Sequence, residues 1–361
     1  MTKRGSFKNA VRRQARASGT AYTEALATMT QPDPDVAARV QAATQWRGEE
    51  SLGAHLETRY GIKVSAVTKL SPHGAGVFRV DRGDGPAWVA RLYPRDARPA
   101  DKVEADAEIL RFLELHDLPA ERCAHLEPVS THLGQSVLVT EFVDGRPGEV
   151  TVEHEHALAD LLGRVHALPP ASGALSRDGG AFPHDPLREG RPNEDLVAAK
   201  SFLDAIDGDV PVGRRARLDS LRARLESADD CEGLPEAFTH PDMVDRNVIV
   251  TPDGRRVAVD WKGAGRGPRL ASFAFLLHGA GLVPGGDTEI VEAIVEGYSR
   301  HVTLEHEELA RLAGAMRVRP LYFDCWSYWR SVLGGKIPEG EDSEDELTDA
   351  IAGKAVAALT R

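Results

Sequence analysis

Two carboxylates and an amide stand at fixed separations between His240 and Asp260. Asp242 follows two residues after His240, Asn247 comes five residues later, and Asp260 ends the stretch. Amide and carboxylate oxygens are suitable ligands for a hard cation such as Mg²⁺, which keeps room for phosphate oxygens. Asp242, on the loop before the other two, could accept the proton of an attacking hydroxyl. These residue types at these spacings are what metal-assisted phosphoryl transfer requires.

The segment between Asn247 and Asp260 is predicted to be a β-hairpin. It consists of two short apolar runs on either side of a Pro-Asp-Gly turn. With the turn centred on its Asp-Gly pair, Thr251 pairs with Arg256, and counting outward places Asn247 directly opposite Asp260. Cross-strand partners have Cβ atoms about 4.5–5.5 Å apart, so the amide and the carboxylate could share one cation. An ordinary surface hairpin is the alternative interpretation.

The order His-x-Asp-x-x-x-x-Asn, hairpin and Asp resembles the catalytic segment of the aminoglycoside phosphotransferase family. Members of that family are small-molecule kinases that share the protein-kinase fold. The resemblance implies that Asp242 is the catalytic base, and that Asn247 and Asp260 bind Mg²⁺. It also implies an α+β, two-lobed protein-kinase-like fold, with a small β-rich N-lobe and a larger, mostly helical C-lobe.

Two positions depart from the family pattern. Pro241 stands where members usually have glycine, and Ser272 stands where an aspartate usually follows the Gly-Pro pair. A serine hydroxyl cannot accept backbone hydrogen bonds as a carboxylate does. We therefore expect the metal-binding loop of this chain to be supported differently.

The resemblance also assigns nucleotide-binding residues by position. Gly74 and Gly76 form a Gly-x-Gly pair between two predicted strands, where the backbone could approach a triphosphate closely. Arg91, on the third predicted strand, stands where the family has lysine, and it would bind the α- and β-phosphates of the nucleotide. The hinge after the last strand would bind the adenine edge through the backbone of Glu141 and Val143.

Asp106 lies at the family position for the acidic partner of the strand cation, so we expect it to pair with Arg91 near the bound nucleotide. A shorter acid that faces a longer base preserves the total reach of the pair. Glu104 and Glu108 lie on neighbouring faces of the same predicted helix and are the alternatives.

Three regions are expected along the chain: a basic extension at 1–34, the N-lobe at 35–143, and the C-lobe with the catalytic loop and substrate site at 144–361. The extension is expected to lie on the acidic body or to fray, and contact of its basic helix with nucleic acid or a membrane is the alternative. Strands are predicted at 64–70, 76–80, 87–93 and 136–142, and helices at 101–115, 154–167, 193–206, 211–228, 287–299 and 306–333.

Composition restricts the class of protein and of partner. The 361 residues are 42% hydrophobic and carry a net charge of −12. A soluble globular protein is predicted, and nucleic acid is disfavoured as its main substrate. An acidic surface favours a cationic small molecule. We recognise no secretory signal, no membrane-spanning run and no metal-ligand spacing among the three cysteines, so a cytoplasmic location is expected.

The sequence predicts an ATP-dependent (or GTP-dependent) O-phosphotransferase that acts on a small hydroxylated molecule, such as an aminoglycoside or another cationic antibiotic. Two alternatives stay open. One is a kinase of a metabolic alcohol, like the choline, homoserine and fructosamine kinases. The other is a nucleotide-binding pseudokinase whose N-terminal helix docks a partner. Intact Asp242, Asn247 and Asp260 favour the enzyme, whereas Arg91 and Ser272 leave room for the pseudokinase. No oligomeric state is predicted.

Overall fold

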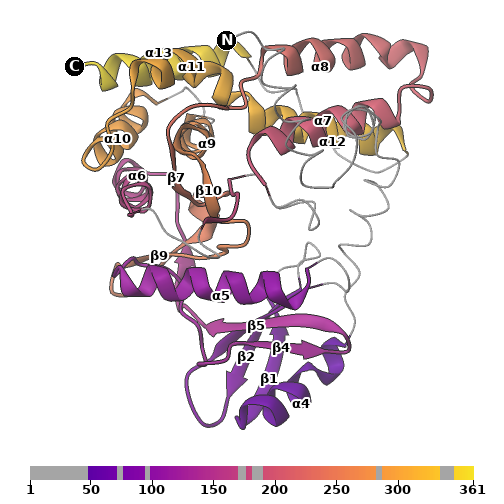
Figure 1. The fold of residues 1–361 in the computed structure, drawn as a ribbon, viewed down its shortest axis with the longest axis vertical. Helices are drawn as coiled ribbons and strands as arrows, with labels where there is room; N and C mark the ends of the chain where they lie inside the picture. Colours follow the sequence, from indigo (N-terminus) through magenta and orange to yellow (C-terminus); the bar gives the residue numbers. More distant parts are fainter. Residues whose placement is uncertain are drawn as a thin grey trace.

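The protein consists of a β-rich lobe followed by a mostly helical lobe, stacked along its long axis (Figure 1). The computed structural model describes residues 48–70, 76–93, 98–169, 176–180, 190–281, 287–333 and 345–361. The two-lobed α+β architecture that the resemblance implied is therefore observed. The predictions for Gly74 and for the basic extension at 1–34 lie outside the described residues.

A five-stranded antiparallel sheet in the order β1-β2-β3-β5-β4 forms the first lobe. Helix α4 (Glu49–Tyr60) covers one face and α5 (Ala100–Leu115) the other. Along the interior strand β5, Val137 and Val139 pack with α4 while Leu138 packs with α5, as expected for a strand buried on both faces. The strands are β1 (Val64–Lys69), β2 (Val77–Arg82), β3 (Trp88–Leu92), β4 (Val129–His132) and β5 (Gln135–Glu141).

Helix α5 lies between the sheet and the helical lobe (Figure 1). Its apolar residues Val103, Ala107 and Leu110 recur at helical spacing and are at most 2% exposed. They belong to a core cluster that continues into helix α6 (Val152–His166) of the second lobe. The helix therefore shares one continuous core with the lobe that carries the catalytic loop.

The second lobe holds the remaining helices and two small sheets. One sheet pairs β7 (Glu236–Thr239) with β10 (Gly265–Pro268), and the other has the order β6-β8-β9, with β6 at Arg146–Pro147, β8 at Val248–Val250 and β9 at Arg256–Ala258. Two 3₁₀ turns are η2 (Val212–Arg214) and η3 (Asp245–Asn247). The helices after α6 are α7 (Asn193–Ala205), α8 (Arg215–Ser227), α9 (Arg269–Gly281), α10 (Thr288–Ser299), α11 (His306–Met316), α12 (Val318–Val332) and α13 (Asp345–Leu359).

One predicted helix needs correction, and three elements were not predicted. The single helix predicted over 306–333 is two helices, because Pro320 lacks the amide hydrogen that would continue the ladder of α11 into α12. Helix α9 was not predicted. Its residues Leu270, Phe273 and Leu277 are fully buried, and a helix that is buried all round shows no polar stripe. Helix α13 and strand β4 were also not predicted.

No helix among the described residues is long and apolar enough to span a lipid bilayer.

Candidate active site

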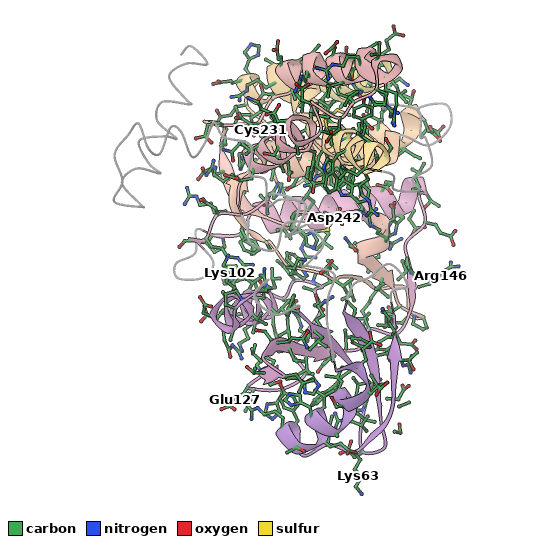
Figure 2. The ribbon with its side chains drawn as sticks, turned by 90° about the vertical axis from the view of Figure 1, so that its right-hand side faces the viewer. Lys63, Lys102, Glu127, Arg146, Cys231 and Asp242 are labelled. Atoms are coloured by element: carbon green, nitrogen blue, oxygen red, sulfur yellow. The ribbon has the colours of Figure 1, made fainter. Side chains whose placement is uncertain are left out.

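The loop from His240 to Asn247 lies between β7 and β8, at mid-height of the molecule where the lobes meet (Figure 2). The His240 ring holds this loop. Its Nδ1 accepts the Asp242 N–H at 3.0 Å, so Nε2 carries the proton and donates to the Val259 carbonyl at 3.2 Å. Burial lowers the pKa of His240, and its ring packs edge-on against Trp261 with centroids 4.6 Å apart. A neutral histidine thus ties the loop to the strand that leads to Asp260.

The carboxylate of Asp242 is held by two donors from its own loop. Asn247 Nδ2 donates to Asp242 Oδ2 at 2.8 Å and to the Asp242 carbonyl at 2.8 Å. Arg246 Nη2 lies 3.1 Å from both carboxylate oxygens. Because the amide nitrogen of Asn247 makes these bonds, its amide oxygen is the atom available to a cation. One face of the Asp242 side chain reaches solvent, since it is 11% exposed.

The predicted register of the hairpin is wrong by one residue. Thr251 pairs with Arg255 rather than with Arg256: the Thr251 N–H donates to the Arg255 carbonyl at 2.8 Å. The loop has three residues, and its last residue, Gly254, has φ 82 and donates to the Thr251 carbonyl. A turn followed by a left-handed glycine is the usual three-residue hairpin connection.

As a result, Asn247 lies opposite Val259, whose N–H donates to the Asn247 carbonyl at 2.8 Å. Asp260 follows one residue later and leaves the ladder with φ 67, in the left-handed region. That conformation costs a non-glycine residue roughly 1–2 kcal/mol. Direct cross-strand pairing therefore does not bring Asn247 and Asp260 together, and their sharing of one cation stays a prediction.

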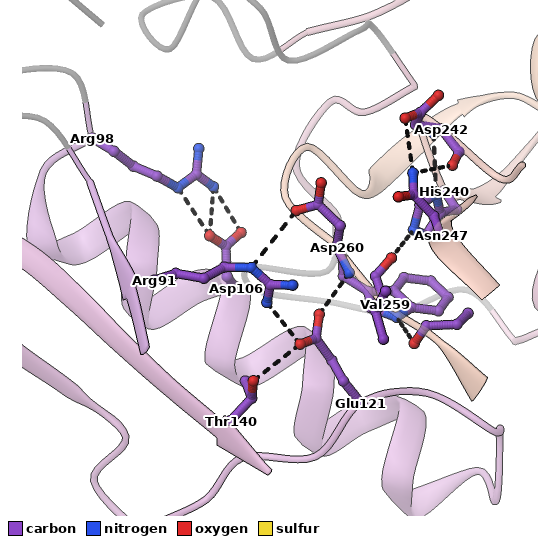
Figure 3. A network of polar contacts seen from close by, with 12 residues as sticks. Arg91, Arg98, Asp106, Glu121, Thr140, His240, Asp242, Asn247, Val259 and Asp260 are labelled. Atoms are coloured by element: carbon purple, nitrogen blue, oxygen red, sulfur yellow. Dashed lines mark hydrogen bonds and ion pairs between the residues drawn. The ribbon is translucent and has the colours of Figure 1, made fainter. Parts of the chain in front are cut away.

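The carboxylate of Asp260 lies among cations. Burial alone would raise the pKa of Asp260, but Arg91 and Lys262 hold it below its usual range. Arg91 Nε lies 3.8 Å from Asp260 Oδ1 (Figure 3). The side chain of Asp260 is nevertheless 47% exposed, so an ionised oxygen faces the space between the lobes.

The predicted ion pair between Arg91 and Asp106 is wrong. Asp106 is 2% exposed and binds Arg98, whose Nε and Nη2 lie 2.9 and 2.7 Å from its oxygens (Figure 3). Arg177 Nη2 donates to the same carboxylate at 2.7 Å. The side chain of Arg98 is 0% exposed, and a fully buried guanidinium requires an acidic partner. A role for Asp106 in nucleotide binding therefore cannot act through Arg91.

Arg91 pairs instead with Glu121, which the sequence analysis did not single out. Arg91 Nη1 donates to Glu121 Oε2 at 2.7 Å, and the hydroxyl of Thr140 donates to the same oxygen at 3.1 Å. The other oxygen, Oε1, accepts the Asp260 N–H at 2.8 Å. The three partners are separated from Glu121 by 19 to 139 residues in the sequence, so no local sequence pattern indicates the role of Glu121.

A family model described as the phosphotransferase enzyme family (APH) matches residues 72–314, more than half of the 361 residues. The chain belongs to the phosphotransferase enzyme family. The family resemblance drawn from the catalytic motif is therefore confirmed, and so is the prediction of a phosphotransferase with hydroxyl acceptors. None of the curated proteins compared with the chain matches it.

Solved structures of small-molecule kinases share the fold. Spectinomycin phosphotransferase APH(9)-Ia gives a TM-score of 0.59 at 13% identity, over 87% of this chain and 99% of that one. Amicoumacin kinase hAmiN gives 0.58 at 15% identity, over 90% and 96%. Choline kinase LicA from Streptococcus pneumoniae gives 0.53 at 17% identity, over 86% and 98%. Identity this low shows the fold alone, and the predicted protein-kinase-like fold is confirmed.

In this chain, Ser272 and Arg319 support the catalytic loop. The Ser272 hydroxyl donates to the His240 carbonyl at 3.2 Å. Arg319, on α12, donates through Nη2 to the next carbonyl, that of Pro241, at 2.9 Å. Arg319 Nη2 also lies 3.6 Å from Asp195 Oδ2, and both side chains are buried. Two side-chain donors therefore hold consecutive carbonyl groups of the loop.

The other predicted nucleotide contacts have structural roles as well. A Cβ at Gly76 would lie 2.2 Å from the Leu92 carbonyl oxygen, so the close approach of β2 and β3 explains this glycine. The N–H groups of Glu141 and Phe142 donate to the Arg122 and Ala87 carbonyls. Recognition of adenine at the family hinge therefore stays a prediction for the Glu141 carbonyl and the Val143 N–H.

Beside this network, His154, Glu155 and Asp245 are the group with metal-ligand types among the described residues. His154 Nδ1 accepts from Arg256 Nε at 3.4 Å, so its Nε2 keeps the proton, and Nε2 lies 4.0 Å from Asp245. Ligands of a tetrahedral metal with bonds of about 2.0–2.1 Å lie closer than this. Burial and the Asp245 carboxylate raise the pKa of Glu155 to about 9. A protonated Glu155 on α6 beside the Asp245 carboxylate of η3 fits better than a metal centre.

Proposed function

We propose that the protein transfers the γ-phosphoryl group of ATP, or of GTP, to a hydroxyl group of a small cationic molecule. The observation that carries this proposal is the unsatisfied Nε atom of Arg91. Its Nε is buried and has no hydrogen-bond partner among the described residues, while it points toward the half-exposed Asp260. A buried donor without an acceptor costs about 1–3 kcal/mol. An inner phosphate oxygen of a nucleotide would satisfy it.

Asn247 and Asp260 are the residues that would hold Mg²⁺, through one amide oxygen and one carboxylate. Both are hard oxygen ligands, and the cations around Asp260 keep it ionised, so the donor set fits the metal. Bound there, Mg²⁺ supplies charge neutralisation for the β- and γ-phosphates. The position of these two oxygen ligands beside Arg91 supports a divalent cation as the cofactor and a nucleotide as the phosphoryl donor.

Asp242 is the proposed base. Arg246 and Asn247 fix its carboxylate, and the neutral His240 fixes the backbone beneath it. A carboxylate in a fixed position can orient the acceptor hydroxyl and take its proton as the new P–O bond forms. The protein forms no covalent bond to the substrate in this reaction. Positioning of the reactants and stabilisation of charge therefore account for most of the rate acceleration.

The acceptor class is inferred from charge and from related kinases. The net charge of −12 favours a cation. Related structures include a spectinomycin phosphotransferase, a choline kinase and an aminopropanol kinase, and choline and aminopropanol are alcohols with a cationic nitrogen. We favour an aminoglycoside or another cationic antibiotic, with a metabolic amino alcohol as the second candidate. All three cysteines are free thiols, which fits the reducing cytoplasm as the site of this activity.

The test is a screen of the purified protein with Mg²⁺ and ATP or GTP against aminoglycosides, spectinomycin, choline and homoserine. Mass spectrometry reports the gain of one phosphate by the acceptor, and Asp242→Asn serves as the inactive control. If nucleotide binds but no hydroxylated compound is phosphorylated by the wild type, the enzyme proposal is rejected in favour of a pseudokinase.

A further inference from the structure

The carboxylate of Glu121 is 3% exposed and touches three separate parts of the active site (Figure 3). Oε2 accepts from Arg91 on β3 and from Thr140 on β5, and Oε1 accepts the backbone N–H of Asp260. One buried acid thus contacts both residues that the proposed function places at the phosphates and the metal. Its charge is balanced by Arg91, at 2.7 Å.

The segment that carries Glu121 belongs with the catalytic hairpin. The Glu121 N–H donates to the Ala258 carbonyl at 2.9 Å, and the Ala258 N–H donates to the Pro119 carbonyl at 2.8 Å. Ala120 and Ala258 form an isolated parallel bridge. Because β9 leads directly into Asp260, Glu121 is fixed to the element that positions the proposed metal ligand.

Helix α5 has a different attachment. Its acid, Asp106, is held by Arg98 and by Arg177. Arg177 Nε also donates to the Ala264 carbonyl at 2.7 Å, in the loop after Asp260. Asp106 therefore connects α5 to that loop through Arg177, whereas Arg91 on β3 pairs with Glu121.

We propose that Glu121 is the positioning residue of the nucleotide site, which aligns Arg91 for the phosphates and holds Asp260 in its left-handed conformation for the metal. The inference rests on the proposed function. Accepting the Asp260 N–H offsets the strain of φ 67, and the negative charge keeps Arg91 from collapsing onto Asp260. The alignment of Arg91 and Asp260 then depends on the backbone hydrogen bonds between residues 119–121 and β9, and not on the position of α5.

The test compares Glu121→Gln with a matched buried acid remote from the cleft. Glu308 is 0% exposed and likewise accepts from an arginine, Arg269, and from a backbone N–H, that of Glu305. Both substitutions remove a buried charge that faces an arginine, so both should lower Tm. Only Glu121→Gln should weaken Mg²⁺–nucleotide binding in calorimetric titration, by about ten- to a hundred-fold, the worth of a hydrogen bond to a charged group.

Thr140→Val is the milder second variant, for use if Glu121→Gln fails to fold. It removes one of the three donors to the same carboxylate and leaves Arg91 and the Asp260 N–H in place. The loss of Mg²⁺–nucleotide affinity should therefore be smaller than in Glu121→Gln, about two- to ten-fold. If the folded Glu121 or Thr140 variant binds nucleotide as tightly as Glu308→Gln does, Glu121 is only structural and the inference is overturned. If the wild type itself binds no Mg²⁺–nucleotide, the proposed function fails, and the inference fails with it.

Discussion

Replacing Asp242 by asparagine separates chemistry from binding. An amide in this position can still accept from Asn247 through its oxygen, at the place where the carboxylate accepts at 2.8 Å. Arg246 loses one acceptor, but its side chain is 62% exposed and can turn to water. An exposed ion pair is worth about 0–1 kcal/mol, so the variant should stay folded. The lost base should reduce kcat by about 10²–10⁴, which is roughly 2.7–5.5 kcal/mol of barrier.

The assay is steady-state kinetics with an acceptor from the screen, together with calorimetric titration of Mg²⁺–nucleotide. Asp245→Asn is the control, because it makes the same chemical change three residues away in the same loop. Asp242→Asn should bind nucleotide like the wild type while turning over far more slowly, and Asp245→Asn should keep its turnover. A kcat within a few-fold of wild type for Asp242→Asn would refute the role of this carboxylate as the base.

Three further predictions concern the phosphate side of the site and the buried acid pair. Asp260→Asn keeps a residue that tolerates positive φ, so the fold should hold while Mg²⁺-dependent nucleotide affinity, measured by titration, falls more than in Asn247→Ala. Unchanged affinity would contradict the metal assignment. Arg91→Lys should retain substantial activity, whereas Arg91→Ala should raise the nucleotide KM strongly; equal kinetics for Arg91→Ala and wild type would reject phosphate binding by this residue. Because the pKa of Glu155 is raised to about 9 from its usual value of 4.5, the folded protein keeps a proton that the unfolded chain releases. Stability should therefore fall as pH rises between these values. Glu155→Gln should flatten that fall in Tm, and an unchanged profile would show that this acid does not titrate as inferred.

What the sequence predicted well is local. The His-x-Asp-x-x-x-x-Asn spacing brings Asp242 and Asn247 together because eight consecutive residues form one loop, and its side chains bond to each other. The hairpin was predicted at the right place. Its register was not, because the conformation of Gly254 decides whether the loop has two or three residues, and both are compatible with Pro-Asp-Gly.

What the sequence could not predict is the choice of partners at long range. Position in the family motif assigned Asp106 to Arg91, but the fold brings two other arginines, Arg98 and Arg177, to that acid. Arg91 then takes Glu121, 30 residues away in a segment without regular periodicity. Ion-pair partners depend on which buried charges meet in the folded core, and no spacing rule contains that information.

The pairing between residues 119–121 and β9 has a mechanical consequence. The next carbonyl group, that of Arg122, accepts the N–H of Glu141 at the end of β5. The contact between residues 119–121 and β9 therefore lies beside the segment that connects the two lobes. The lobes cannot separate at these two contacts without breaking backbone hydrogen bonds. Arg91 and Asp260 are both bonded to Glu121 beside these contacts, so their relative position should change little if the lobes open for nucleotide exchange.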